Sequence, residues 1–287
     1  MDNHTTVIMD KISRIDYTIQ YQDLDQNNRL RLYTLENYLL NSAGIVADQG
    51  GFGMRYLVQQ NLTWVLTNLS LQISYLPTVD EVMTVETWVE KNIHMLSVRN
   101  FRLSVAGRLI GLVRSVWAVI SMTDRTAQNV FDQPAFLDMA NGLPVSLERA
   151  PRMHAFSNVE RVISGWLAGD YCEIQPSESS PVGIWPHKVQ YSDIDYNGHC
   201  NSCKYLEFML NACEPTGLKR SLPLSPAELG ETRGLRIDIK YAREVRRGDD
   251  VAVLFLNEGN AIHYELRTAA GEISCQACIS ACSSTAV

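Results

Sequence analysis

The chain has 287 residues, enough for one large domain or two of ordinary size. A hydrophobic content of 46% with 20% charged residues indicates a globular protein with a full core and excludes an intrinsically disordered chain. The net charge of −7 argues against nucleic acid as the main partner, and no apolar run approaches the roughly 20 residues that cross a bilayer.

The cysteine content and the N-terminal residues indicate the compartment. Seven cysteines, an odd number, do not form the disulfide framework of a small secreted protein. The first residues, MDNHTTVIMDKISRIDYT, have neither a hydrophobic signal core nor the Arg- and Ser-rich character of a transit peptide. We therefore expect a cytoplasmic protein that does not insert into membranes.

The chain contains two copies of one segment. Residues 19–44 align with residues 189–214 at an offset of 170 without a gap. The matching residues include Tyr21 with Tyr191, Asp23 with Asp193, Asp25 with Asp195, Asn27 with Asn197, and Asn41 with Asn211. Both copies then show the i, i+3, i+4, i+7, i+8 spacing of a helix with one buried face. The positions are Leu35, Tyr38, Leu39, Ser42 and Ala43 in the first copy, and Tyr205, Phe208, Met209, Ala212 and Cys213 in the second.

Long strand-like segments follow each predicted helix. In the first half they lie at 62–75, 82–90, 94–105 and 107–122, and in the second half at 235–241, 251–256, 262–267 and 274–280. Residues 235–241 alternate, with Leu235, Ile237, Ile239 and Tyr241 on one face and Arg236, Asp238 and Lys240 on the other.

This order of elements predicts an α+β fold, a tandem double hotdog in which two long helices are each wrapped by an antiparallel sheet. We expect an N-terminal hotdog at 1–131, a linker at 132–185 with a short helix around 158–167, and a C-terminal hotdog at 186–287. An ordinary α+β protein with a chance repeat is the alternative. Since one chain already holds a pair of hotdogs, both a monomer and a homodimer are compatible with this prediction.

The loop before the second helix carries the candidate site. Asp195, Asn197, Gly198 and His199 stand together there, whereas the first copy has Asn28 and Arg29 in place of the glycine and the histidine. A helix N-terminus offers N–H groups and partial positive charge to a developing oxyanion, Gly198 allows close approach of a carbonyl, and Asn197 adds a side-chain donor. The His199 imidazole suits proton transfer near neutral pH.

Glu244 is a second candidate, because it aligns with Thr78 when Tyr241 is set against Tyr75. Two proton-transfer groups are then replaced together in the first half, which indicates one catalytic half and one half that binds acyl chains or serves structure. No Ser lies in a G-x-S-x-G elbow, so attack by water is simpler than a covalent intermediate. Each residue alone also fits a turn, a helix cap or a loop charge.

The sequence resembles the acyl-ACP thioesterases of plant plastids and bacteria. The family signature D-x-N-x-H-x-N-x-x-K-Y stands here from Asp195 to Tyr205, and a later Y-R-R-E-C segment appears at 241–245 with valine in place of cysteine. The resemblance implies a bacterial cytoplasmic enzyme that hydrolyses fatty acyl-ACP to free fatty acid and ACP. The implied partner is an acyl carrier protein with a phosphopantetheine-linked acyl chain, and no cofactor or metal is expected. The catalytic candidates are Asp195, Asn197, His199 and Glu244, and the candidates for substrate binding are Gly198, Asn201, Trp64, Arg243, Arg246 and Arg247.

Other functions remain open at this point. An acyl-CoA thioesterase of the 4-hydroxybenzoyl-CoA type has the pattern D-x-x-G-H-x-N followed by a tyrosine, which this loop resembles with Asp195, Gly198, His199, Asn201 and Tyr205, although those proteins are usually single hotdogs. A hotdog dehydratase or hydratase and a non-catalytic acyl-binding hotdog are further alternatives. Zinc binding by Cys200, Cys203, Cys275 and Cys278 fits on spacing alone, but residues three apart on a strand point to opposite faces.

Overall fold

The computed structural model describes residues 8–9, 11–169, 182–213, 228–230 and 232–283. The chain divides into two compact units. The first comprises Met1–Arg149, Pro226–Gly234 and Ser283–Val287, and the second Ala150–Ser225 and Leu235–Cys282. Among the described residues no helix has the length and apolar character that a membrane crossing requires.

The first unit is built on an antiparallel sheet with the order β1-β2-β4-β5-β6-β3, and β7 pairs with β6. Its strands are β1 (Ile8–Met9), β2 (Ile12–Thr18), β3 (Leu62–Ile73), β4 (Val82–Ile93), β5 (Leu96–Val105), β6 (Arg108–Ser121) and β7 (Ala127–Gln128). Its helices are η1 (Tyr21–Asp23), α1 (Leu32–Gln49), α2 (Met54–Leu57), η2 (Val58–Gln60) and α3 (Pro134–Leu137). The four long strands predicted from the sequence are confirmed.

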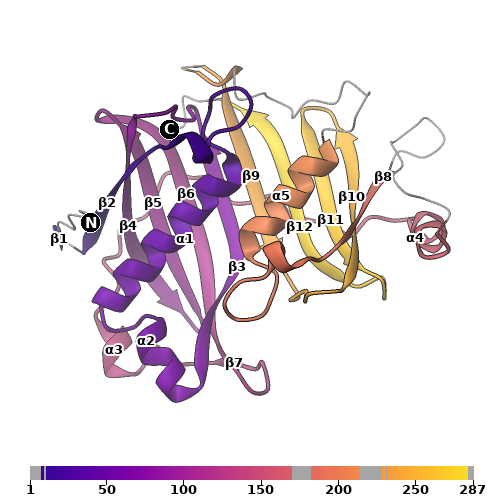
Figure 1. Cartoon of the computed structure of the whole chain (residues 1–287). Helices are drawn as coiled ribbons and strands as arrows, with labels where there is room; N and C mark the ends of the chain where they lie inside the picture. The colour runs from indigo at the N-terminus through magenta and orange to yellow at the C-terminus, as the bar shows by residue number, and fades with distance from the viewer. Residues whose placement is uncertain (1–7, 10, 170–181, 214–227, 231, 284–287) are drawn as a thin grey trace. The chain divides into compact units, whose positions relative to one another are not determined.

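The helix α1 lies along one face of this sheet (Figure 1). Leu35, Leu39 and Ala43 are buried at the spacing of one helical face, as the sequence predicts, and Ser42 is buried with them. Tyr38 is only partly buried, because its hydroxyl group reaches back to Asp23 in η1 at 2.8 Å.

The second unit repeats this plan with the strand order β9-β12-β11-β10-β8. Its elements are α4 (Glu160–Leu167), β8 (Val182–Lys188), η3 (Tyr191–Asp193), α5 (Ser202–Cys213), β9 (Gly234–Tyr241), β10 (Asp250–Glu258), β11 (Ala261–Thr268) and β12 (Ile273–Cys282). The helix α5 lies against β8 and β10 and buries Tyr205, Phe208, Met209 and Ala212. The helix and strands predicted for this half are thus confirmed.

The segment that connects the two sheets packs on their surfaces. In the first unit the Trp88 indole donates to the Leu143 carbonyl at 2.7 Å, and Arg114 donates to the carbonyls of Val145 and Leu147. In the second unit the predicted short helix is present as α4, and Val159 packs against residues of β8 and β10. Residues 182–185, which the sequence analysis assigns to the linker, form the start of β8.

The alternation in β9 does not separate a buried face from an exposed one. Leu235, Ile237 and Ile239 are buried, but Arg236 and Asp238 on the opposite face are buried as well. The two charged side chains form a bidentate ion pair, with Nε–Oδ2 and Nη2–Oδ1 distances of 2.8 and 2.7 Å. Burial of this polar face depends on packing that the strand pattern cannot reveal.

Candidate functional site

The loop between η3 and α5 is held closed by Asp195. Its Oδ1 accepts the backbone N–H groups of Asn197 at 2.9 Å and of His199 at 3.3 Å. The backbone N–H of Asp195 donates to the His199 carbonyl at 2.8 Å, and that of Gly198 donates to the Asp195 carbonyl at 3.1 Å. These bonds form a compact turn with His199 at its end.

The first unit contains the same turn. There Asp25 Oδ1 accepts the N–H groups of Asn27 at 2.8 Å and of Arg29 at 3.0 Å. Asn28 has a φ of 59°, where Gly198 has a φ of 79°. Glycine therefore serves a left-handed backbone position in this turn, and a Cβ atom placed there would meet nothing within 4 Å.

The backbone around the expected oxyanion site is largely hydrogen-bonded. In the loop before α5, the N–H groups of Asn197, Gly198 and His199 already donate to Asp195. The Asn201 side chain also caps α5, because its Oδ1 accepts the Cys203 N–H at 3.1 Å. The turn and the cap thus use these N–H groups, and an oxyanion site at the helix N-terminus stays a prediction. The side chain of Asn197 is exposed on the loop.

His199 and Glu244 come together. The distance from His199 Nε2 to Glu244 Oε2 is 3.2 Å, with side chains 18% and 36% exposed. An imidazole in contact with a carboxylate at a partly open surface is chemically able to exchange protons with a bound molecule. The structure therefore brings together two of the four predicted catalytic side chains, from positions 45 residues apart in the sequence.

Two hydrogen bonds fix the backbone on either side of Glu244. The Cys200 N–H donates to the carbonyl of Val245 at 2.7 Å, and the Tyr205 hydroxyl donates to the carbonyl of Arg243 at 3.3 Å. Both donors belong to the loop and helix that carry His199. The segment with the carboxylate is thus attached to the element with the imidazole.

The alignment of Glu244 with Thr78 is wrong by two residues. In the first unit the Leu30 N–H donates to the Pro77 carbonyl, just as the Cys200 N–H donates to the Val245 carbonyl. The backbone equivalence is therefore Pro77 with Val245, an offset of 168.

Other bonds follow the same offset. The Ile19 N–H donates to Glu81 and the Val189 N–H donates to Asp249. At this offset Leu76 takes the place of Glu244, and the Arg29 guanidinium reaches the Leu76 carbonyl at 3.4 Å. The matched tyrosines misled the alignment, because backbone pairing decides equivalence. The contrast between the two halves remains, with Arg29 and Leu76 in place of the histidine and the glutamate.

The basic candidates lie on the same segment and beyond it. Arg243 forms an ion pair with Glu272 at 3.1 Å, and the Arg247 guanidinium lies 5.8 Å from the ring centre of Tyr191. Arg246 is exposed. Lys219 and Arg220, also considered for a basic surface, lie outside the described residues.

Trp64, the other substrate-binding candidate, belongs to the first unit. Its indole N–H donates to the Phe52 carbonyl at 3.0 Å, and its ring contacts Phe131 and Phe136 with centroids 6.2 and 6.1 Å away. These side chains belong to an apolar cluster that includes Ala47, near the C-terminal end of α1.

The cysteines near the site are buried thiols. Burial, and then the nearby carboxylates Asp193 and Asp195, raise the pKa of Cys200 to about 12. Such a thiol stays protonated at neutral pH and is a poor nucleophile. Val245, at the position of the family cysteine, is fully buried. Within the described ranges, no three His, Cys, Asp or Glu side chains are grouped so as to hold a metal ion.

Asp193 and His187 were not predicted as site residues. Asp193 is buried in η3, and its Oδ2 lies 2.9 Å from His187 Nε2 on β8. Its backbone carbonyl accepts the Asn201 N–H at 2.8 Å, at the other end of the loop. The repeat could have drawn attention to Asp193, because Asp23 aligns with it. It could not have shown His187, which lies outside the aligned segment 189–214.

Comparison with known proteins agrees with the fold. The family model described as the acyl-ACP thioesterase N-terminal domain matches residues 10–135, and that of the C-terminal domain matches residues 182–280. The chloroplastic acyl-[acyl-carrier-protein] hydrolase FATB3 of Cuphea viscosissima is 25% identical over 84% of this chain and 54% of its own length. The chain thus spans about half the length of the curated relatives it matches.

Solved structures show the same fold over almost the whole chain. The crystal structure of an acyl-ACP thioesterase from Bacteroides thetaiotaomicron has a TM-score of 0.74 and 28% identity, covering 96% of this chain and all of that one. The 12:0-ACP thioesterase from Umbellularia californica has a TM-score of 0.71 at 15% identity, covering 96% of this chain and 99% of that one. The predicted double-hotdog, α+β fold is confirmed. Because the two family models together match most of the sequence, this chain belongs to the acyl-ACP thioesterase family.

Proposed function

We propose that this protein hydrolyses the thioester of fatty acyl-ACP, releasing a free fatty acid and ACP. The observation that carries this proposal is the 3.2 Å contact between His199 and Glu244. The corresponding positions of the first unit hold Arg29 and Leu76, which cannot transfer protons at neutral pH. Membership of the family and the names of the relatives support the choice of acyl-ACP as substrate.

In the proposed reaction a water molecule attacks the thioester carbonyl carbon. The His199–Glu244 pair accepts a proton from the water as the C–O bond forms. The tetrahedral intermediate collapses with cleavage of the C–S bond, and the pair returns a proton to the departing phosphopantetheine sulfur. Water serves as the nucleophile because the nearby Cys200 thiol stays protonated.

The remaining loop residues have supporting parts in this proposal. The exposed Asn197 amide is the candidate donor to the oxyanion, a contribution of about 3–4 kcal/mol when such a donor is correctly aimed. Asp195 closes the loop that carries Asn197 and His199, and Gly198 provides its left-handed turn. We therefore assign Asp195 mainly to positioning. Asn201 caps the following helix, and its contact with substrate stays a prediction.

The carrier and the acyl chain have separate candidate surfaces. Arg243, Arg246 and Arg247 are exposed close to Glu244 in the sequence and suit an acidic carrier protein. The first unit, with Trp64 in an aromatic cluster, is the candidate for the acyl chain. If Trp64→Leu left the relative kcat/KM values for different chain lengths unchanged, Trp64 would not contribute to the choice of chain.

The test is release of free fatty acid from matched acyl-ACPs and acyl-CoAs by the wild type and His199→Ala. We expect hydrolysis of acyl-ACP and its loss in the variant. Preference for acyl-CoA would favour an acyl-CoA thioesterase of the 4-hydroxybenzoyl-CoA type with the same site. No hydrolysis of either substrate by the folded wild type would favour a non-catalytic acyl-binding hotdog.

A further inference from the structure

The buried carboxylate of Asp193 lies at the base of the candidate catalytic loop. Its Oδ2 accepts the Gln190 N–H at 2.8 Å and lies 2.9 Å from His187 Nε2. Its backbone carbonyl accepts the Asn201 N–H, and Ile194 forms a bridge with Cys200 just above it. Asp193 therefore stands at the start of the loop that holds His199 and is hydrogen-bonded to its end.

The first unit has the same aspartate with a different side-chain donor. Asp23 Oδ2 accepts the Gln20 N–H at 2.8 Å, and the Asp23 carbonyl accepts the Arg31 N–H at 2.9 Å. The side-chain donor is the Tyr38 hydroxyl at 2.8 Å, and its ring stacks on Tyr17 with centroids 4.2 Å apart.

In the second unit the strand residue of the ring pair, not the helix residue, contacts the aspartate. At the offset of 170, His187 replaces Tyr17 and Phe208 replaces Tyr38. The rings remain in contact, with centroids 4.2 Å apart. Phe208 has no hydroxyl group, so the donor to the aspartate now comes from the strand residue instead of the helix residue.

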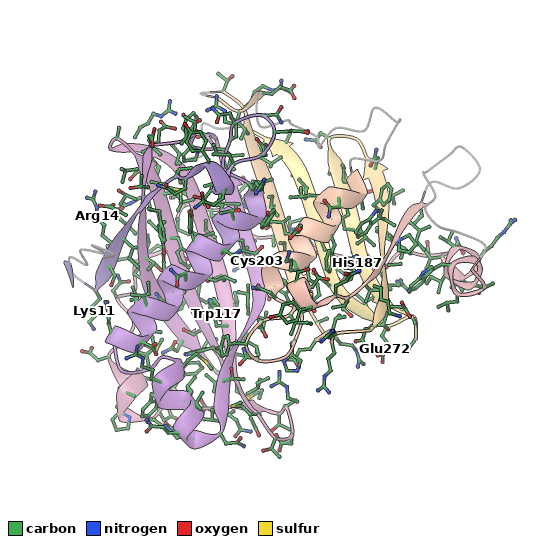
Figure 2. The ribbon with its side chains drawn as sticks, viewed as in Figure 1. Lys11, Arg14, Trp117, His187, Cys203 and Glu272 are labelled. Atoms are coloured by element: carbon green, nitrogen blue, oxygen red, sulfur yellow. The ribbon has the colours of Figure 1, made fainter. Side chains whose placement is uncertain are left out.

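The packing around His187 is suited to a fixed ring. The Trp185 ring stacks on the His187 ring, with centroids 5.4 Å apart and an interplanar angle of 7°. The His187 side chain is 20% exposed. Figure 2 labels His187 in the second unit, where it comes from β8, the strand against which α5 lies. The ammonium group of Lys204 also faces Asp193, at 4.0 Å from Oδ1, but lies closer to Glu207, at 2.7 Å.

We propose that His187 is a positioning residue for the hydrolytic reaction, which acts through Asp193 to hold the catalytic loop in place. This inference rests on the proposed function. It assigns to His187 no contact with the substrate. The first unit needs only the fold that Tyr38 and Asp23 provide, whereas the second also needs His199 held against Glu244.

The key test replaces the histidine and then restores a donor by copying the first unit. His187→Phe removes the donor to Asp193 and keeps a ring in the stack. The double variant His187→Tyr with Phe208→Tyr rebuilds the pair found in the first unit. Tyr38→Phe is the matched control, because it removes the equivalent bond to Asp23 in the other unit.

Two measurements are made on each folded variant. The first is hydrogen exchange of the Asn201 backbone amide, which donates to Asp193 and does not depend on catalysis. We expect about tenfold faster exchange in His187→Phe and near wild-type exchange in the double variant. The second is steady-state hydrolysis of one acyl-ACP. We expect kcat to fall roughly 10- to 100-fold in His187→Phe with KM changed less than about threefold, and to recover in the double variant.

The results separate this inference from the proposed function. If wild type does not hydrolyse acyl-ACP, or His199→Ala retains full activity, the proposed function fails, while the exchange of the Asn201 amide still tests the link to Asp193. If His199→Ala is inactive but His187→Phe keeps the wild-type kcat, the positioning role is refuted. Equal losses of kcat in His187→Phe and Tyr38→Phe would also refute it, because they would indicate general destabilisation.

Discussion

Replacement of Glu244 by glutamine gives the sharpest separation between catalysis and stability. Glu244→Gln keeps the size of the side chain and its capacity for hydrogen bonding, but removes the negative charge 3.2 Å from His199 Nε2. The backbone around the residue stays fixed by the Cys200 N–H and the Tyr205 hydroxyl. The substitution therefore changes the chemistry of the pair without opening the loop.

The expected cost to stability is small. The pair carries two opposite charges only when the imidazole is protonated; two such charges 3.2 Å apart would attract by about 5 kcal/mol at an effective dielectric constant of 20, and by about 1 kcal/mol in water, so these values are an upper bound. Because the Glu244 side chain is 36% exposed, solvent screens the pair toward the lower value. Side-chain entropy offsets part of what remains, so the free energy of unfolding should change by about 0–1 kcal/mol.

The expected cost to catalysis is much larger. Loss of one partner in general acid–base catalysis lowers rates by roughly 10²- to 10⁴-fold, or about 3–5 kcal/mol of barrier height. The assay is single-turnover and steady-state release of fatty acid from one acyl-ACP, combined with chemical unfolding of the same preparation. Glu272→Gln is the matched control, since it removes an exposed carboxylate that forms an ion pair with Arg243, the residue directly before Glu244. A kcat for Glu244→Gln within about threefold of wild type would refute a role for the pair in proton transfer.

Three further outcomes follow from the same geometry. Tyr205→Phe should lower kcat about tenfold with little change in KM, because its hydroxyl no longer holds the backbone before Glu244; an unchanged kcat would contradict this role. Thiol-alkylating reagents at pH 8 should leave the native enzyme active, because the Cys200 pKa of about 12 keeps the thiol protonated until the pH approaches that value; rapid inactivation that Cys200→Ala abolishes would show otherwise. Combined Arg246→Glu and Arg247→Glu should raise KM for acyl-ACP about tenfold at low salt while leaving kcat similar, and an unchanged KM would exclude these residues from carrier binding.

The sequence by itself determined the repeat and most of the elements. Hydrophobic spacing placed Leu35, Leu39 and Ala43 on the buried face of α1, because a helix that covers a sheet must bury one stripe. Alternating and apolar runs located the long strands, since their period of two is independent of what covers them. The loop with Asp195 and His199 was visible because the first half keeps the aspartate but lacks the histidine.

Only the tertiary structure decided how the loop is connected to its surroundings. It showed that Leu76, and not Thr78, is the counterpart of Glu244, because backbone hydrogen bonds rather than matched side chains define the register of that segment. It also showed that Asp195 already occupies the nearby backbone N–H groups. The contact between His187 and Asp193, six residues apart, depends on how the chain turns from β8 into η3, and the residue types alone do not reveal that side-chain pairing.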